Sequence, residues 1–319
     1  MNLKKIKLEE LQYNKNISKK IHFCYKTDLL HRDYQNLYYK TNFVNKSFEM
    51  NTTNKVIVPM TLNETENNYS FFGDPVEIFF SEKISKSIYQ ELISIFKEIN
   101  FETKFKIEIK DEKLLNEKHD YIEKIINEIY IDLSLKPDQI KSNFSSNHRN
   151  EISKNYLNST FEIIDYKNYK KDTIFEMMEL HKHVSGRQTR SIESWKQNEK
   201  MILEKKGFIT KVKLDNKVIS FSFFYHNNFT CIYSSSVGLR EYYKIVRNMH
   251  HKSLWLAINY AKKYCNYFYI GPITIYSKEN ISEKEKNLQK FKNKFKGINK
   301  KFIIINKLPN YETLKQIFL

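Results

Sequence analysis

The sequence predicts an α+β protein and not a doubly wound parallel sheet. Three strand-like segments follow one another with short turns at Asp215-Asn216 and His226-Asn-Asn228, which predicts an antiparallel meander. Two helical stripes precede this meander, and a long helix and a further strand, Tyr267–Ile270, follow it. Helices and strands in this order are typical of an α+β domain.

The second half of the chain contains the clearer elements. Pro137 stands in the first turn of a predicted helix that runs past Arg149 to Ile152. The remaining expectations are a strand at Phe161–Ile164, helices over 174–184, 192–202 and 254–261, and meander strands at Phe208–Leu214, Val218–Tyr225 and Phe229–Ser234.

The helices and strands of the first half of the chain are less clearly predicted. Ile122, Ile125, Ile126 and Ile129 recur at helical spacing, so we expect a helix there and a closing strand at Tyr130–Leu133. The other elements expected in this half are strands at Lys55–Met60, Val76–Phe80 and Lys104–Lys110, and a helix with Ile84, Ile88, Leu92 and Ile95 on one face. We therefore expect two domains, residues 1–133 and 134–319.

Composition bounds the class of protein. A hydrophobic content of 40% and an aromatic content of 15% allow a packed core and exclude wholesale disorder. The net charge of +17 favours polyanionic partners, which are nucleic acid, anionic lipid or phosphorylated substrates. Lysine is abundant along the whole chain, so a local run of lysines is weak evidence by itself.

The sequence contains no signal for export or membrane insertion. The first residues lack an apolar core, and no run approaches the ~18 apolar residues of a membrane span. Cys24, Cys231 and Cys265 are unclustered and lack metal-ligand spacing, which indicates reduced thiols. We expect a cytoplasmic protein without a transmembrane segment, either free or in peripheral contact with the inner face of the membrane.

The segment Lys284–Gly297 combines lysines with an aromatic stripe. Leu288, Phe291 and Phe295 share one helix face, and Gly297 is a plausible stop. Lys292 leaves the helix at the edge of the stripe, where a lysine can reach into a cleft while its stem packs. The segment suits a phosphate-bearing substrate, and the alternative is a plain solvated helix.

Two other basic positions are candidates for anion binding. Arg187 and Arg190 follow Gly186 near a predicted helix start, where guanidinium groups and backbone N–H groups suit phosphate or carboxylate. The alternative for this pair is surface ion pairing with Glu193 or Glu199. Arg149 either extends into a substrate site or lies on an exposed helix face.

Several types of catalytic site are disfavoured. No HExxH, CxxC or nucleophile elbow is present, which argues against a zinc enzyme or a serine hydrolase. The segment Ser234–Asn248 contains one glycine, Gly238, and lacks the glycine-rich pyrophosphate loop typical of acyl-CoA N-acetyltransferases.

Over about its last 190 residues the sequence resembles the FemAB-like branch of the GNAT superfamily. The resemblance ends in Phe291-Lys292, Phe295 and Gly297, against a family ending F-K-x-x-F-G, so Lys296 stands where the family has glycine. The other matching positions, in chain order, are Ile131-Asp-Leu-Ser134, Arg149, Ile152, His181, Gly186-Arg187, Thr189-Arg190, Trp195, Gln197, Trp255, Ala261, Gly271 and Lys284-Glu285.

The resemblance implies tandem GNAT-like domains, each with a mixed, largely antiparallel sheet flanked by helices. It implies acyl or aminoacyl transfer to an amine acceptor, in synthesis of cell-wall peptidoglycan or a surface glycan. The donor would be aminoacyl-tRNA or acyl-CoA, with no bound cofactor or metal. The acceptor would be a lipid-linked compound or nucleotide sugar that bears phosphate, and tRNA is an expected partner.

The resemblance also implies roles for residues. Lys292, Tyr233 and Ser234 are the catalytic candidates, with Tyr233 and Ser234 lining the acyl-transfer cleft. The substrate-binding candidates are Arg149, Arg187, Arg190, Trp195, Gly271, Phe291 and Phe295. Two other functions remain open, an acyl-CoA-dependent N-acyltransferase acting on a nucleotide sugar or small amine, and a non-enzymatic basic protein that binds RNA or membrane.

Overall fold

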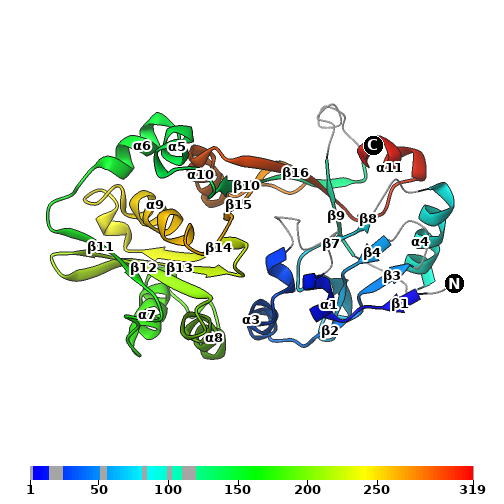
Figure 1. Ribbon diagram of the computed structural model, residues 1–319, viewed down its shortest axis with the longest axis horizontal. Coiled ribbons are helices and arrows are strands. Elements are labelled where there is room, and N and C mark those ends of the chain that lie inside the picture. The colour runs from blue at the N-terminus through cyan, green and yellow to red at the C-terminus, as the bar shows by residue number, and fades with distance from the viewer. Residues whose placement is uncertain are drawn as a thin grey trace. The chain divides into compact units, whose positions relative to one another are not determined.

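The computed structural model describes residues 3–13, 24–50, 56–80, 85–98, 103–109 and 120–318. The chain divides into two compact units. Figure 1 shows the chain coloured by residue number from the N-terminus to the C-terminus. Unit 1 comprises Met1–Glu128, Pro272–Lys286 and Asn299–Leu319. Unit 2 comprises Ile129–Gly271 and Asn287–Ile298. Residues 272–286 and 299–319 thus pack with unit 1, whereas the sequence pattern had placed them in the second domain.

Unit 1 contains short strands in three groups with helices packed against them. Two groups have the strand orders β1-β3-β4-β8 and β2-β5-β6, and the third contains β10, β16, β9 and β7. Its helices are α1 (Leu8–Tyr13), α3 (Leu29–Tyr39), α4 (Lys86–Glu98) and α11 (Tyr311–Phe318). Its strands are β1 (Leu3–Lys5), β2 (Phe43–Asn45), β3 (Phe48–Met50), β4 (Val56–Val58), β5 (Thr61–Asn63), β6 (Asn68–Ser70), β7 (Val76–Glu77), β8 (Phe79–Phe80), β9 (Phe105–Glu108) and most of β16 (Ile298–Ile305).

The main core of unit 1 joins segments that are far apart in sequence. Leu92 and Phe96 of α4 pack with Phe105 of β9 and Ile305 of β16. This arrangement is possible because β16 pairs antiparallel with β9, with Ile303 opposite Ile107. The predicted α4 face is confirmed from Ile88 to Ile95, and Ile84 lies outside the described residues.

Unit 2 is built on an antiparallel meander that continues into a parallel pair. Its strand order is β11-β12-β13-β14-β15-β10, in which β11 to β14 are antiparallel neighbours and β14 and β15 are parallel. Helices α7 and α8 cover one face of the meander, and α5, α6 and α9 lie on the other (Figure 1).

The elements of unit 2 agree with the predicted ones except at one helix. The single helix expected from Pro137 to Ile152 is two helices, because Phe144 is extended and Ser145 caps the start of the second. The elements of unit 2 are α5 (Pro137–Asn143), α6 (Ser146–Ser153), β11 (Ser159–Ile164), α7 (Thr173–Ser185), α8 (Ile192–Leu203), β12 (Gly207–Leu214), β13 (Lys217–His226), β14 (Thr230–Gly238), η3 (Arg240–Tyr242), α9 (Met249–Ala261), β15 (Tyr267–Ser277), α10 (Glu283–Lys292) and η4 (Asn293–Phe295). Strand β15 and helix α10 each begin in one unit and end in the other. The predicted α+β class is confirmed.

One predicted helix is wrong. The isoleucines at 122, 125, 126 and 129 belong to a single strand, β10 (Ile122–Asp132). Buried residues occur on both faces of this strand, including the adjacent pair Ile125 and Ile126, so its pattern does not alternate. A strand buried on both sides can imitate helical spacing, and its β-branched residues were the better signal.

Three further observations concern Leu288, the helices and the cysteines. Leu288, expected on the buried face of the C-terminal helix, is 45% exposed. Among the described residues, no helix combines the length and the apolar character that crossing a membrane requires. Cys231 and Cys265 are buried and form no disulfide bond, and the side chain of Cys24 lies outside the described residues.

Candidate functional site

The parallel strands β14 and β15 separate within unit 2. Their pairing ends with Ile232 opposite Tyr269. Tyr233 and Ser234 follow on one strand, and Ile270 and Gly271 follow on the other. Where two parallel strands stop pairing, their backbone N–H and C=O groups become available to a ligand. We call the place where β14 and β15 separate the strand split.

A β-bulge lies directly at the strand split. Phe223 of β13 faces Ser235, and the next residue, Phe224, faces Tyr233. Ser234 is therefore the extra residue of β14, and it is exposed. Bulges re-aim neighbouring side chains and interrupt pairing, which makes this a suitable position for a reacting group.

Gly271 and Lys292 meet on the other side of the split. Gly271 has a φ of +111°, and a Cβ added to it would lie 2.6 Å from Nζ of Lys292. The lysine side chain therefore crosses the backbone at Gly271, and no larger residue fits there without displacing the ammonium group. Glycine also tolerates this backbone angle, which other residues rarely adopt.

The segment that carries Lys292 is anchored by aromatic packing. Phe295 is completely buried, and its ring centroid lies 4.1 Å from that of His148 and 5.3 Å from that of Phe144. The half-buried Phe291 packs on Phe295 and on His251. Both phenylalanines thus hold the segment in place, which gives them a structural role beside any contact with substrate.

The chain turns sharply after Phe295. Lys296 adopts a left-handed conformation with a φ of +41°, which explains why glycine is favoured at this position in the family that the sequence resembles. Gly297 is required for a different reason, because a Cβ there would collide with the backbone carbonyl of Tyr130 on β10.

Tyr233 belongs to a chain of polar groups that sequence reasoning missed. Its hydroxyl interacts with the hydroxyls of Ser222 and Ser236. Ser236 Oγ lies 3.2 Å from Nδ1 of His250, and Nε2 of His250 lies 3.3 Å from the Tyr243 hydroxyl. Burial lowers the pKa of His250 to about 4, so its imidazole is neutral near pH 7. Burial likewise raises the pKa of Tyr233 to about 12, which keeps its phenol protonated.

The predicted anion-binding arginines do not form one cluster. Arg149 lies on α6, and its guanidinium donates to the backbone carbonyls of Ser142 and Phe144 at the end of α5. Arg187 and Arg190 lie beside α7 and α8, on the opposite face of the meander (Figure 1). We therefore leave Arg149 out of the site proposed below, because its guanidinium caps a helix.

Trp195 and Arg190 lie at the junction of α7 and α8. Trp195 is buried, and the Arg190 guanidinium carbon lies 5.1 Å from its ring centroid. A cavity of about 180 Å³ opens beside this junction. It is lined by Met178, Glu179, His181, Lys182, Gln188, Thr189, Ile192 and Trp195. Arg187 is exposed and follows the left-handed Gly186.

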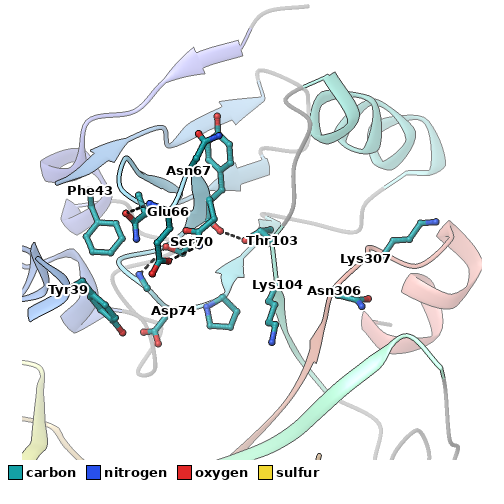
Figure 2. Close-up of a pocket in the computed structure, with 15 residues that line it drawn as sticks. Tyr39, Phe43, Glu66, Asn67, Ser70, Asp74, Thr103, Lys104, Asn306 and Lys307 are labelled. Atoms are coloured by element: carbon teal, nitrogen blue, oxygen red, sulfur yellow. Dashed lines mark hydrogen bonds between the residues drawn. The ribbon is translucent and has the colours of Figure 1, made fainter. Parts of the chain in front are cut away.

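Unit 1 contains a second candidate site, a cavity of about 900 Å³ (Figure 2). Tyr39, Phe43, Glu66 and Asp74 lie on one side of it, and Lys104, Asn306 and Lys307 lie on the other. The other lining residues are Asn63, Asn67, Asn68, Tyr69, Ser70, Gly73, Pro75 and Thr103. Asp74 pairs at 2.6 Å with Lys26, whose side chain is only 6% exposed.

Comparison with solved structures identifies the architecture. The crystal structure of FemX matches with a TM-score of 0.59 at 13% sequence identity, and the match covers 100% of each chain. The chain therefore shares the fold of FemX. A conserved protein of unknown function from Bacteroides thetaiotaomicron VPI-5482 matches with a TM-score of 0.51 at 12% identity, over 96% of this chain and 100% of that one. No protein-family model and no curated protein sequence matches the chain.

Within the FemX fold, the structure brings Gly271 and Lys292 together and places Tyr233 and Ser234 where β14 leaves β15. The unit 1 cavity was not found from sequence, because its walls come from segments as distant as 39–43 and 306–307. Its one local signal was the turn Gly73-Asp74-Pro75, which also predicts an ordinary loop. The described residues hold no group of three or more His, Cys, Asp or Glu side chains suited to a metal ion.

Proposed function

We propose that the protein transfers an acyl or aminoacyl group to an amine acceptor in the synthesis of peptidoglycan or a surface glycan. The FemX fold and the residue pattern around Lys292 support this proposal. The single observation that carries it is the ammonium group of Lys292, which lies over the strand at Gly271 just beyond the strand split.

The proposed chemistry is direct transfer. The acceptor amine attacks the donor carbonyl carbon, a C–N bond forms, the bond to the donor oxygen or sulfur breaks, and one amine proton passes to the leaving oxygen or sulfur. Lys292 Nζ stabilises negative charge that develops on the carbonyl oxygen or that resides on a nearby phosphate. Tyr233 and Ser234 line the other strand and orient the reactants. This route needs no covalent enzyme intermediate.

The segment Ser234–Asn248, which leads from β14 into α9, argues against acyl-CoA and makes aminoacyl-tRNA the first candidate donor. Its one glycine, Gly238, packs so closely on α9 that an added Cβ would lie 3.0 Å from Nε2 of His250. Gly238 therefore serves packing and does not open backbone N–H groups to a pyrophosphate. The turn η3 (Arg240–Tyr242) follows it directly. An acyl-CoA-dependent N-acyltransferase remains the second candidate.

The unit 1 cavity suits a sugar ligand. Tyr39, Phe43 and Tyr69 offer aromatic walls, and asparagines, a serine and a threonine offer hydrogen bonds, a combination that fits a sugar. Lys104 and Lys307 are exposed on its rim and suit a phosphate group. We propose a nucleotide sugar or a lipid-linked glycan as the acceptor, and a cytoplasmic protein that is either free or in contact with the inner face of the membrane.

The experiment incubates the purified protein with charged tRNA or with acyl-CoA, against nucleotide-sugar and lipid-linked acceptors, and detects acceptor mass gain by mass spectrometry. We expect transfer by the natural protein and at least ~100-fold less by Lys292→Ala. Lys290→Ala, an exposed lysine on the same helix, is the matched control and should retain activity. Transfer by Lys292→Ala at the natural rate would contradict the proposal.

A further inference from the structure

We propose that one surface of unit 2 docks on an anionic membrane. The surface comprises residues 154–158 and 240–247, and we call it the loop face. Leu157 is 87% exposed, Ile245 53% and Tyr243 43%. Large apolar side chains exposed together on one rigid surface mark an interaction site more often than chance exposure does.

The segment 240–247 is a rigid turn that holds Ile245 outward. The backbone N–H groups of Ile245 and Val246 both donate to the carbonyl of Tyr242, at 3.0 and 2.8 Å. Val246 is fully buried and packs with Leu239 and Met249. Val246 anchors the turn in the core, and its neighbours Ile245 and Arg247 are exposed to solvent.

The segment 154–158 is fastened to this turn. Nδ2 of Asn248 donates to the carbonyls of Glu151 and Lys154, at 3.0 and 2.9 Å. Nζ of Lys252 donates to Oδ1 of Asn155 at 2.5 Å. In Figure 1 the connections from α6 to β11 and from β14 to α9 lie at the same end of unit 2. Tyr156 and Tyr242 also pack on the cluster that contains Val246, so Leu157 and Ile245 stand on neighbouring segments.

The charges beside these apolar residues select an anionic partner. Four exposed cations surround them, namely Lys154, Arg240, Lys244 and Arg247. The carboxylates nearby are Glu151, which pairs with Lys154 at 2.6 Å, the exposed Glu241, and the exposed Asp215, which accepts a hydrogen bond from Asn158 at 2.6 Å. Apolar tips that insert among lipids, with cations beside them for the headgroups, are the usual pattern of a peripheral membrane contact.

The phosphates of a nucleic acid would bind the same cations as lipid headgroups do. A nucleic acid would gain little from an exposed leucine and isoleucine. Leu157 and Ile245 therefore distinguish a membrane from RNA. The inference does not depend on the proposed transfer reaction, because membrane binding requires no turnover.

The test is cosedimentation of the full-length protein with vesicles of phosphatidylcholine alone or with about 30% phosphatidylglycerol. We expect binding to the anionic vesicles only. The double variant Leu157→Ser/Ile245→Ser should bind about tenfold more weakly, because each lost apolar contact removes area buried in the bilayer. Lys244→Ala should weaken binding about fivefold, and Leu203→Ser, at a leucine that is 55% exposed on α8, should change nothing.

Three results would overturn the inference. The first is no binding of the natural protein to anionic vesicles. The second is equal binding by the natural protein and the double variant while Lys244→Ala binds less, which would show a purely electrostatic contact. The third is tight binding of tRNA that the double variant leaves unchanged while vesicles do not bind, which would assign the loop face to RNA. Unchanged melting temperatures establish that the variants are folded.

Discussion

The ammonium group of Lys292 lies over the backbone of Gly271, where an added Cβ would be 2.6 Å from Nζ. The two residues are on different elements, β15 and α10, and their contact depends on the absence of a side chain at 271. The position of the lysine is therefore set by a glycine that the strand pattern alone would not single out.

Gly271→Ala should displace Lys292 and lower transfer at least tenfold, equivalent to about 1.4 kcal/mol in the activation free energy. The matched control is Gly186→Ala. Gly186 also has a positive φ, +71°, but no atom lies within 4 Å of an added Cβ. Alanine at 186 carries left-handed strain of about 1–2 kcal/mol, whereas the φ of +111° at 271 lies outside that region, so the melting temperature of Gly271→Ala should fall further. Equal activity of the two variants would show that the contact with Lys292 is not needed.

Tyr233→Phe should lower turnover by about 10–100-fold, because it removes a hydroxyl that lies where β14 and β15 separate. Since burial raises the pKa of Tyr233 to about 12, activity between pH 7 and 9 should show no titration from this phenol. A pH–rate profile checks both expectations. Tyr264→Phe, three residues after α9 ends, removes an exposed phenol hydroxyl and should leave the rate unchanged.

Lys296→Gly should stabilise the protein by about 0.5–1 kcal/mol. Lys296 has a φ of +41°, where a side chain is disfavoured, and relief of that strain exceeds the extra entropy glycine adds to the unfolded chain. Denaturant unfolding measures the change. Lys290→Gly places the same substitution within helix α10 and should destabilise by about 1 kcal/mol. A loss of stability in Lys296→Gly would contradict the strain argument.

Stability should fall as the pH drops below about 6.5. His148 and His251 face each other through Nδ1. Burial, aided by His251 and Lys294, lowers the pKa of His148 to about 3. Burial, aided by Lys294 and His250 and opposed by Glu151, lowers the pKa of His251 to about 4. In the unfolded chain histidine titrates near 6.5. Between these values the unfolded state binds more protons, so the stabilisation present above pH 6.5 is lost at up to about 1.4 kcal/mol per pH unit for each histidine.

His148→Phe tests the pH effect, since a phenylalanine can pack with Phe144 and Phe295 but cannot take a proton. Thermal melts from pH 7.5 to 4.5 should show a shallower loss of stability in this variant. His183→Phe, at an exposed histidine on α7, should keep the full slope. The same slope in all three proteins would rule out the buried pair as its cause.

Several elements were predictable because their signals are local. The meander turns at Asp215-Asn216 and His226-Asn228 produced the expected strands, and the helical stripe of α8 buries Trp195 and Ile202 as expected. Phe291, Lys292 and Phe295 were recognisable as a group because a helix repeats every 3.6 residues. Their packing partners, His148 and His251, were not, since each lies on another helix.

The sequence by itself determined the α+β class, the elements of unit 2 and the candidate group around Lys292, because side-chain period and turn chemistry are properties of neighbouring residues. Only the tertiary structure decided that β10 is one strand, that residues 299–319 pack in unit 1, and that the Arg149 guanidinium caps α5. Each depends on contacts between distant segments, such as Ile303 opposite Ile107. The spacing of apolar residues indicates which face of an element is buried, but it does not identify the segments that pack against that face.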